Sequence, residues 1–210
     1  MNARMVIGGI VGLLATIGVL TPAGAQSQND RADAARLVEV LQLGTASTVA
    51  DIGAGGGALT VLVAQRIGPA GRVYSTDINP DRLNEIRASI TAAGLQNVTV
   101  LEGGSSRTHL PDGCCDAVFM RHVYHHIAEP PDMNASLLRA LRPGGRLAIA
   151  DFAPRSGRTL PPGQRGETAA DHGVGPQTVI EELRAAGFID LEQLPWPSPG
   201  YFLVTGRRAP

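Results

Sequence analysis

The feature that most constrains this chain is the stretch "VADIGAGGGALT", residues 49–60, which places four glycines within five positions directly after a short apolar run. Glycine loses more backbone entropy on folding than any other residue, so a cluster of it in an ordered region needs a physical reason. Either the chain turns there with backbone angles that glycine adopts most easily, or a ligand lies against the main chain.

The sequence that follows alternates between two hydrophobic periodicities. Short apolar runs, typical of strands buried on both faces, alternate with segments of helical spacing. The expected strands are 47–53, 71–78, 97–104, 114–121 and 146–152, and the expected helices are 57–68, 79–94, 130–145 and 176–188. This alternation predicts parallel strands joined by right-handed crossovers, and hence a doubly wound α/β sheet.

The C-terminal part of the chain breaks this alternation. Segments 189–195 and 200–208 are strand-like and are separated by a short Pro/Ser/Gly loop without a helix. We therefore expect an antiparallel hairpin, which completes a seven-stranded, mostly parallel, Rossmann-like sheet within a single domain, residues 26–210. The segment 153–176 is rich in Gly, Pro and Arg, and a loop of that length is typically functional or disordered.

Residues 1–25 form a separate unit of the sequence. Arg4 precedes an uncharged apolar run over residues 5–20, and the small-residue triplet Ala23-Gly24-Ala25 follows. This is the layout of a secretory signal peptide, with cleavage expected after Ala25, and it predicts a periplasmic or secreted protein. An uncleaved anchor that tethers the protein to a membrane through residues 5–20, and a misassigned start codon, are the alternatives.

The two cysteines, Cys114 and Cys115, are adjacent in the sequence. A disulfide between neighbouring residues requires a strained ring, so we expect none. We expect instead two small residues that enter a buried strand.

Composition argues against a polyanionic partner. The formal net charge is −1, and no basic cluster is interleaved with aromatic residues. Nucleic-acid binding is therefore not expected, and the sequence does not indicate the oligomeric state.

The glycine turn is expected at the carboxyl edge of the sheet, where ligands bind in open α/β folds. The N-terminus of the following helix supplies free N–H groups there, and Asp77 ends the next strand, where an acid can accept hydrogen bonds from ribose. The segment 53–58 also matches the dinucleotide pattern G-x-G-x-x-A. A nicotinamide-dependent oxidoreductase is therefore one alternative.

A larger set of motifs resembles the class I S-adenosylmethionine-dependent methyltransferases. The set comprises "VADIGAGGG" with an acid inside the first strand, "YSTDI", "LRPGG" before the fifth strand, and the final strand "GYFLVTGRR". The resemblance covers roughly residues 30–208 and implies S-adenosylmethionine as the cofactor and methyl transfer to an acceptor. A binding module that keeps the nucleoside site without turnover is the non-enzymatic alternative.

The resemblance also implies roles for particular residues. The cofactor-binding positions it indicates are Asp51, Gly53, Gly55, Gly57, Asp77, Ile78 and Ser105. Asp51 would orient the glycine turn and the amino group of the cofactor, Asp77 would hold the ribose hydroxyls, and Ile78 would pack on the adenine. Gly104 stands where many relatives carry an acid for the adenine amino group, so that contact would come from backbone or from Ser105.

The candidates for chemistry follow the fourth strand, in "MRHVYHHIAEPP". Histidine is the usual general base near neutral pH, and an oxygen or carbon acceptor benefits from one. We expect Tyr124 and His125 to face the acceptor pocket and His126 to be a structural hydrogen-bonding residue. His172, in the long loop, is a third catalytic candidate on a segment that can form a lid.

The sequence assigns no metal site and no particular acceptor. Adjacent histidines need further ligands, and none can be identified from spacing alone. The Asn/Asp-Pro-Pro-Tyr/Phe stretch of amino-methylating relatives is missing at the end of the fourth strand, which reads "RHVY". A small, apolar or aromatic acceptor is the expectation.

Overall fold

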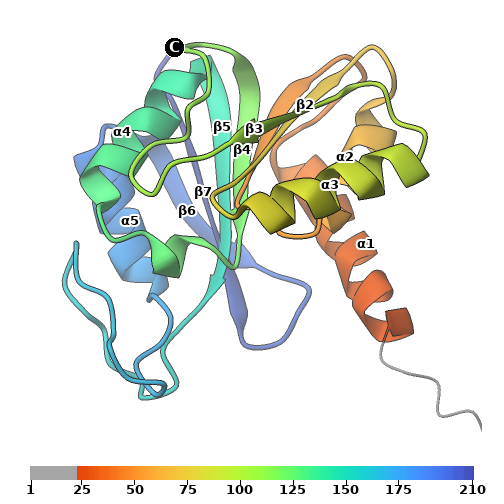
Figure 1. Ribbon diagram of the computed structural model, residues 1–210. Coiled ribbons are helices and arrows are strands. Elements are labelled where there is room, and N and C mark those ends of the chain that lie inside the picture. The colour runs from red at the N-terminus through yellow and green to blue at the C-terminus, as the bar shows by residue number, and fades with distance from the viewer. Residues whose placement is uncertain (1–22) are drawn as a thin grey trace, which may run out of the picture.

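The computed structural model describes residues 23–210 as one sheet with helices on both faces (Figure 1). The strands are β1 (Thr48–Ile52), β2 (Arg72–Asp77), β3 (Val98–Glu102), β4 (Cys115–Arg121), β5 (Leu141–Phe152), β6 (Ile189–Pro195) and β7 (Tyr201–Arg207). The helices are α1 (Ala23–Val40), α2 (Ala58–Ile67), α3 (Pro80–Ala92), α4 (Pro130–Ala140) and α5 (Pro176–Ala185), with a 3₁₀ turn η1 (Tyr124–His126).

The sheet has seven strands in the order β3-β2-β1-β4-β5-β7-β6. The first five are parallel, whereas β7 runs antiparallel to β5 and β6 runs antiparallel to β7. This confirms the predicted doubly wound sheet and its C-terminal hairpin. The strand order reverses at β1, which pairs with β2 on one side and β4 on the other, so the ligand crevice is expected above the end of β1.

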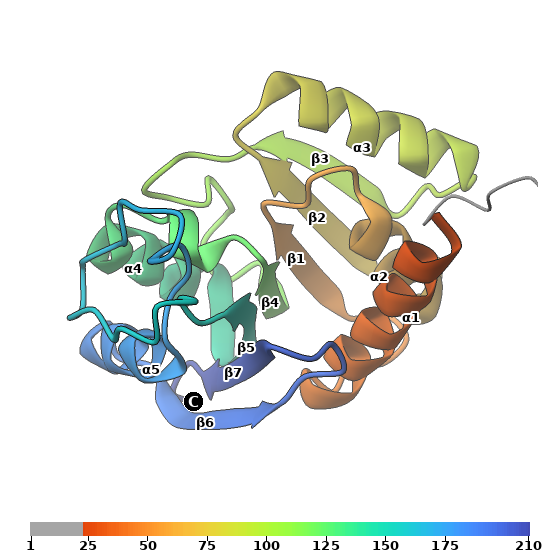
Figure 2. The same cartoon turned by 90° about the horizontal axis from the view of Figure 1, so that it is seen from below.

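The helices divide into two layers (Figure 2). Helices α1, α2 and α3 cover one face of the sheet, and α4 and α5 cover the other. On each face, apolar side chains of the helices pack in a cluster against the central strands, which are therefore buried on both faces. The rigid sheet between these two cores fixes the strand ends from which the site is built.

The element boundaries differ from the expectation at the start of β5. Helix α4 ends at Ala140, and strand pairing begins again at Leu141, five residues before the expected position 146. The register between β4 and β5 shifts between Cys115 and Ala117. The "RPGG" segment is therefore an irregularity within β5, where Gly144 has a positive φ of 77°, and the helix ends before it.

Two elements have no counterpart among the expected ones, namely α1 and η1. Helix α1 packs on α2, and the proposed cleavage point after Ala25 lies in its first turn. The apolar run 5–20 lies outside the described residues, so the signal or anchor there stays a prediction. Within residues 23–210, no helix combines the length and the apolar character needed to cross a membrane.

The cysteine pair corrects another expectation. The structure joins Cys114 and Cys115 in a disulfide between neighbours. Cys115 is fully buried in β4, as expected for a residue entering a buried strand, while Cys114 precedes the strand. The expectation that the two residues are not bridged is therefore wrong.

Candidate functional site

The glycine turn joins β1 to α2 with three left-handed residues. The φ angles are 70° at Gly53, 56° at Gly55 and 80° at Gly57, a region where other residues are strained. A Cβ atom at Gly53 would lie 2.6 Å from Cγ2 of Val123, and one at Gly57 would lie 3.3 Å from Cα of Ile86. A Cβ at Gly55 would meet no atom within 4 Å, because that position faces open space. The glycines therefore allow both the left-handed turn and the close approach of its backbone to Val123 and Ile86.

Asp77, at the end of β2, ties this turn to the neighbouring strand. Its Oδ2 accepts the backbone N–H of Gly55 at 3.0 Å, and its Oδ1 accepts the N–H of Asn79 at 2.9 Å. Asn79 in turn caps α3 by accepting the N–H of Asp81 at 2.9 Å. The carboxylate is held in a fixed orientation, and its remaining lone pairs can accept hydrogen bonds from ribose hydroxyls.

A largely apolar cavity of about 240 Å³ opens beside Asp77. Ile78 at its wall is 63% exposed, more than any other large apolar side chain in residues 29–210, and it offers an apolar surface to a flat ring. Ser105 also lines this cavity, as does Thr76, whose buried Oγ1 has no hydrogen-bond partner. Gly53 forms part of the wall, so the cavity continues toward the glycine turn.

Gly104, the position for which the resemblance implied an acid in many relatives, lies on the same wall. A Cβ atom there would lie 3.0 Å from the backbone oxygen of Arg107 and 3.0 Å from Nε2 of His109. The ring of His109 is fixed by a contact of 3.1 Å between its Nδ1 and the backbone oxygen of Glu102. A side chain at position 104 would therefore pack tightly against Arg107 and His109, which would have to shift to admit a carboxylate.

A second cavity, of about 400 Å³, lies on the other side of the turn. Asp51 lines it from β1, and its Oδ2 accepts a hydrogen bond of 2.6 Å from the hydroxyl of Thr60. Burial raises the pKa of Asp51 from 3.8 to about 7, against the opposing effects of the Thr60 hydrogen bond and of Arg121. A cationic group bound here would stabilise the carboxylate.

Arg121, at the end of β4, lies in the wall of this second cavity. Its guanidinium forms ion pairs of 2.7 Å with both Asp30 and Asp33 of α1. Burial raises the pKa of Asp33, and the hydrogen bond from Arg121 opposes that effect. Helix α1, which the sequence analysis did not identify, thus fixes a cation beside the glycine turn.

The histidine segment after β4 forms η1, and His125 is its most constrained residue. The side chain is only 3% exposed, and its Nδ1 lies 2.8 Å from Oδ1 of Asp151 at the end of β5. Oδ2 of the same carboxylate accepts the backbone N–H of His125 at 3.0 Å. A carboxylate only accepts, so Nδ1 carries the proton, and in the neutral ring Nε2 has the lone pair.

The two sequence neighbours of His125, Tyr124 and His126, each have the role that was expected of the other. His126, expected to be a structural hydrogen-bonding residue, is exposed and lines the cavity beside Asp77. Burial, followed by the neighbouring His125 and His172, lowers the pKa of His126. The tight 3₁₀ turn explains the exchange, because it directs two consecutive side chains in different directions.

Tyr124, expected to face the acceptor pocket, is fully buried instead. Its hydroxyl accepts a hydrogen bond of 2.7 Å from Nδ2 of Asn134 in α4. Arg165 stacks over the ring at 5.5 Å from its centroid. Burial raises the pKa of Tyr124, with Glu182 acting in the same direction. The tyrosine is therefore a core residue, and this corrects the expectation.

His172 lies in the long segment between β5 and α5, which hangs below the sheet in Figure 1. It lines a third cavity, of about 740 Å³, together with Phe152 and Tyr201. Its ring centroid is 4.6 Å from that of His125 and 5.4 Å from that of His126. The structure thus brings His125 and His172 together from distant parts of the chain, and the role of this segment as a lid stays a prediction.

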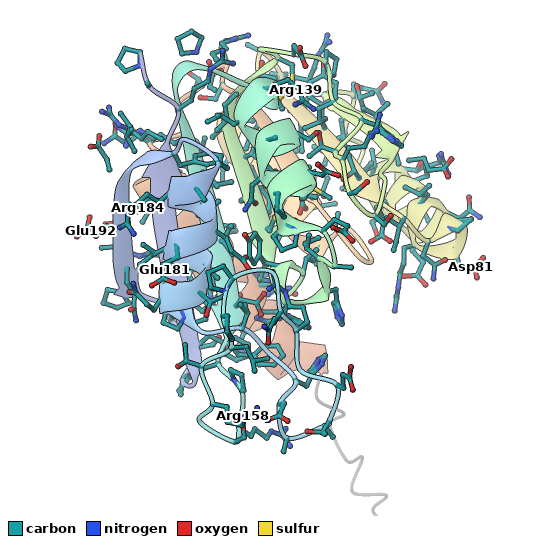
Figure 3. All side chains as sticks on the ribbon, turned by 90° about the vertical axis from the view of Figure 1, so that its left-hand side faces the viewer. Asp81, Arg139, Arg158, Glu181, Arg184 and Glu192 are labelled. Atoms are coloured by element: carbon teal, nitrogen blue, oxygen red, sulfur yellow. A yellow bond between two sulfur atoms is a disulfide. The ribbon has the colours of Figure 1, made fainter. Side chains whose placement is uncertain are left out.

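Residues 153–175, which we call the lid segment, are attached to α5 by a buried ion pair. Glu182 binds Arg165 through two contacts of 2.9 and 3.0 Å and accepts the backbone N–H of Gly163 at 2.7 Å. Arg158, in contrast, lies near the outer end of the segment (Figure 3), with a side chain that is 66% exposed. The segment is therefore an ordered loop with a fixed inner part.

His122 is a site residue that the sequence analysis did not single out. It has a positive φ of 59°, and its ring stacks on Tyr201 with centroids 4.4 Å apart. Burial lowers its pKa, and its buried Nε2 has no hydrogen-bond partner although the residue lines the cavity that contains Asp51. Its position directly after β4 is the one feature of the sequence that could have indicated a place in the site.

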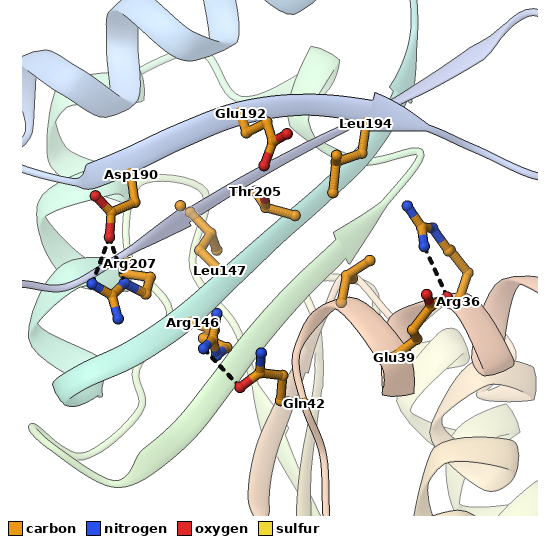
Figure 4. Close-up of a pocket in the computed structure, with 12 residues that line it drawn as sticks. Arg36, Glu39, Gln42, Arg146, Leu147, Asp190, Glu192, Leu194, Thr205 and Arg207 are labelled. Carbon is orange, nitrogen blue, oxygen red and sulfur yellow. Dashed lines mark hydrogen bonds and ion pairs between the residues drawn. The ribbon is translucent and has the colours of Figure 1, made fainter.

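A further cavity, of about 510 Å³, lies between α1 and the β5–β7–β6 face (Figure 4). Most of its charged side chains have partners in the cavity wall: Arg36 pairs with Glu39, Arg207 pairs with Asp190, and Arg146 donates a hydrogen bond to the neutral Gln42. It is far from the glycine turn in the fold, and we assign no function to it.

Comparison with known proteins finds a methyltransferase domain in this chain. A family model described as a methyltransferase domain matches residues 50–149. A ubiquinone/menaquinone biosynthesis C-methyltransferase of Pseudomonas syringae pv. syringae (strain B728a) is 29% identical over 124 residues, which are 59% of this chain and 48% of that protein. The corresponding protein of Stutzerimonas stutzeri (strain A1501) is 32% identical over 106 residues, 50% of this chain and 41% of the relative. The chain thus spans about half the length of the curated relatives it matches.

Solved structures agree in fold. An S-adenosylmethionine-dependent methyltransferase from Aquifex aeolicus superposes with a TM-score of 0.73 at 24% identity, over 87% of this chain and 93% of that one. A Thermotoga maritima O-methyltransferase gives a TM-score of 0.62 at 18% identity, over 85% and 65%. The chain therefore contains a methyltransferase domain over residues 50–149, which begins at the glycine turn, and its fold is similar to that of solved S-adenosylmethionine-dependent methyltransferases.

Proposed function

We propose that this protein transfers a methyl group from S-adenosylmethionine to a small-molecule acceptor. The observation that carries the proposal is that two cavities share Gly53, and that a third adjoins them through ring contacts of its His172 with His126 and of its Tyr201 with His122. The cavity beside Asp77 and the cavity beside Asp51 meet at Gly53, and the cavity under the lid reaches His172. The first two suit the two ends of the cofactor, and the third suits an acceptor.

The residues present fit the cofactor. The orphaned Thr76 hydroxyl and the fixed Asp77 carboxylate supply polar partners for an adenosine, and Ile78 supplies an apolar wall for its base. Asp51 supplies a carboxylate for an ammonium group, and Arg121 lies in the same wall for a carboxylate. When bound, S-adenosylmethionine supplies an electrophilic methyl group for in-line displacement.

His125 is the residue best arranged to take a proton from the acceptor. Asp151 holds its Nδ1–H, so the Nε2 lone pair is directed away from the carboxylate toward the side of His172. This is the orientation that a buried acid imposes on a histidine base. Phe152 lies 4.7 Å from the His125 ring between centroids and helps to exclude water from it.

An aromatic acceptor fits the third cavity best. Phe152 and Tyr201 lie in its wall with their ring centroids 5.8 Å apart, and Pro199 adds apolar surface. The matched relatives are named for C-methylation in quinone biosynthesis, which agrees with an aromatic acceptor. The net charge of −1 argues for a small molecule rather than a nucleic acid.

Residues 1–25 are part of the proposal. We propose that they direct the domain to the periplasm or outside, or anchor it through residues 5–20, because the charge, apolar run and small-residue triplet follow the order of a signal peptide. Sequencing the N-terminus of the protein recovered from membrane and soluble fractions tests this. A chain that starts at residue 26 indicates cleavage, and an intact chain in the soluble cytoplasm contradicts both forms.

The methyl-transfer proposal is tested with S-adenosylmethionine labelled in its methyl group. The full chain is incubated with a panel of hydroxylated aromatic acceptors, and labelled product is separated from cofactor. We expect product with at least one acceptor and its loss in Asp77→Ala. Cofactor binding without any product across the panel would favour the non-catalytic nucleoside-binding alternative. Binding of NADH in place of S-adenosylmethionine would favour the oxidoreductase.

A further inference from the structure

Three imidazoles from two distant segments converge next to the acceptor cavity. His125 and His126 come from η1, and His172 comes from the loop before α5. One ligand atom from each lies within 4.8 Å of the ligand atoms of the other two. The ring centroids of His125 and His126 are 3.9 Å apart. The sequence alone could not identify a third partner for the adjacent histidines, and the fold supplies one.

We propose that His125, His126 and His172 form a binding site for a divalent transition metal ion of the Zn²⁺ class. Three imidazole nitrogens are a donor set that suits Zn²⁺, Cu²⁺, Ni²⁺ and Co²⁺, whereas Mg²⁺ and Ca²⁺ prefer oxygen ligands. Three protein ligands leave one position open, which is the arrangement of catalytic rather than structural zinc sites.

The surroundings of His125 support this assignment. Metal-binding histidines usually donate their second ring N–H to a carboxylate, which fixes the tautomer and the ring orientation. Asp151 does this at 2.8 Å and is itself completely buried, with its two oxygens bound to the Nδ1 and the backbone N–H of His125. The pairing leaves Nε2 of His125 free to act as a ligand.

The loop that carries His172 is fixed on both sides of this residue. The backbone N–H of Val174 donates to the oxygen of Phe152 at 3.0 Å. Gly173 has a φ of 126°, and a Cβ atom added there would lie 2.8 Å from that same oxygen. Asp171 is held by the hydroxyl of Thr168 at 2.8 Å. The third imidazole is therefore positioned by the backbone rather than carried on a free loop.

The site lies between two cavities with different occupants. His126 lines the cavity beside Asp77, and His172 lines the cavity under the lid. An open coordination position here is within reach of water or of an anionic oxygen or sulfur of an acceptor. The inference goes beyond the proposed methyl transfer, because an ion can bind to the three histidines whether or not a methyl group is transferred.

The test is calorimetric titration of ZnCl₂ into tag-free, chelator-treated full chain without cofactor. We expect one Zn²⁺ per chain. His126→Ala and His172→Ala, both at exposed positions, should each weaken binding at least as much as Asp151→Asn, for which loss of the outer carboxylate predicts about a 10- to 100-fold decrease in affinity. His109→Ala, an exposed histidine outside the cluster, is the matched control and should bind like the unchanged chain.

Cobalt(II) provides a second readout that does not depend on activity. Bound Co²⁺ should give the visible absorption of a nitrogen-ligated site with low coordination number, and His172→Ala should remove it while His109→Ala keeps it. The proposal is overturned if the unchanged chain takes up no stoichiometric Zn²⁺, or if His126→Ala and His172→Ala bind it as well as the His109→Ala control.

Discussion

The Nδ1 atom of His125 lies 2.8 Å from Oδ1 of Asp151, and the second oxygen of that carboxylate accepts the backbone N–H of His125 at 3.0 Å. One buried acid at the end of β5 therefore fixes both the ring and the backbone of a histidine that follows β4. This relationship orients the Nε2 lone pair of His125 either for proton transfer or for binding a metal ion, and one lone pair cannot do both at once.

Replacing Asp151 with asparagine tests this orientation. Asp151→Asn should lower kcat for methyl transfer by on the order of 10²-fold, because the imidazole loses the partner that selects its tautomer. The KM for S-adenosylmethionine should stay within about a factor of two if the residue acts on the acceptor side only. Asp81→Asn, an exposed acid on α3 (Figure 3), is the control. An equal rise in the cofactor KM would indicate a general structural role instead.

Gly53 and Gly94 have similar φ angles, but only Gly53 lies close to another side chain. Replacing Gly53 should therefore lower the free energy of unfolding more than replacing Gly94. Gly94→Ala, at φ 65° with nothing within 4 Å of the added Cβ, should cost roughly 1–2 kcal/mol of unfolding free energy. Gly53→Ala, at φ 70°, should cost about 1–3 kcal/mol more because its Cβ meets Val123. Urea unfolding measures both. Equal costs would mean that Val123 moves aside freely.

The raised pKa of Asp51 predicts a stability that depends on pH. Burial favours the protonated acid, so the folded chain holds a proton that the unfolded chain releases, and stability decreases as pH rises from about 4 to about 7. Raising this pKa from 3.8 to about 7 corresponds to at most on the order of 4 kcal/mol at pH 8. Asp51→Asn should therefore raise the Tm at pH 8 and leave it unchanged near pH 4. A Tm gain of the same size at both pH values would contradict this cause.

The Arg165–Glu182 pair predicts that the lid can be released without changing cofactor affinity. Arg165→Ala leaves the buried Glu182 carboxylate without its cation, which should weaken local attachment by about 1–3 kcal/mol. Trypsin cleavage after the exposed Arg158 should then become roughly tenfold faster or more, since cleavage follows the opened population. Arg184→Ala, on the outer face of α5 (Figure 3), removes another arginine without touching the lid and should have no effect. Unchanged cleavage in Arg165→Ala would mean that other contacts hold the segment.

Much of the fold could be predicted because its signals are local. The apolar runs of the parallel strands, the Asn79 cap with Pro80 behind it, and the short loop before β7 each specify their own element. Helix α1 was missed because the contacts that show its role are long-range. Asp30 and Asp33 pair with Arg121, which is about ninety residues away in the sequence.

In the candidate site, too, local sequence signals could be interpreted and long-range contacts could not. The glycine turn, Asp77 and Ile78 could be predicted because one segment of sequence carries the turn and a second carries the acid. The orientations of Tyr124 and His126 could not, because a 3₁₀ turn replaces the extended or helical geometry that spacing arguments assume. The pairing of His125 with Asp151 and His172 depends on the β4–β5 register and on the path of the lid, which only the folded chain defines.

The most direct test of the central claim is calorimetric titration of S-adenosylmethionine into the full chain and into Asp77→Ala, with Asp81→Ala as the matched control. We predict stoichiometric binding to the unchanged chain and to Asp81→Ala. In Asp77→Ala, binding should weaken by at least about tenfold, since one charge-assisted hydrogen bond contributes roughly 1.5–3 kcal/mol. No binding to the unchanged chain, or equal binding to Asp77→Ala, would contradict the assignment of the cofactor to the glycine turn.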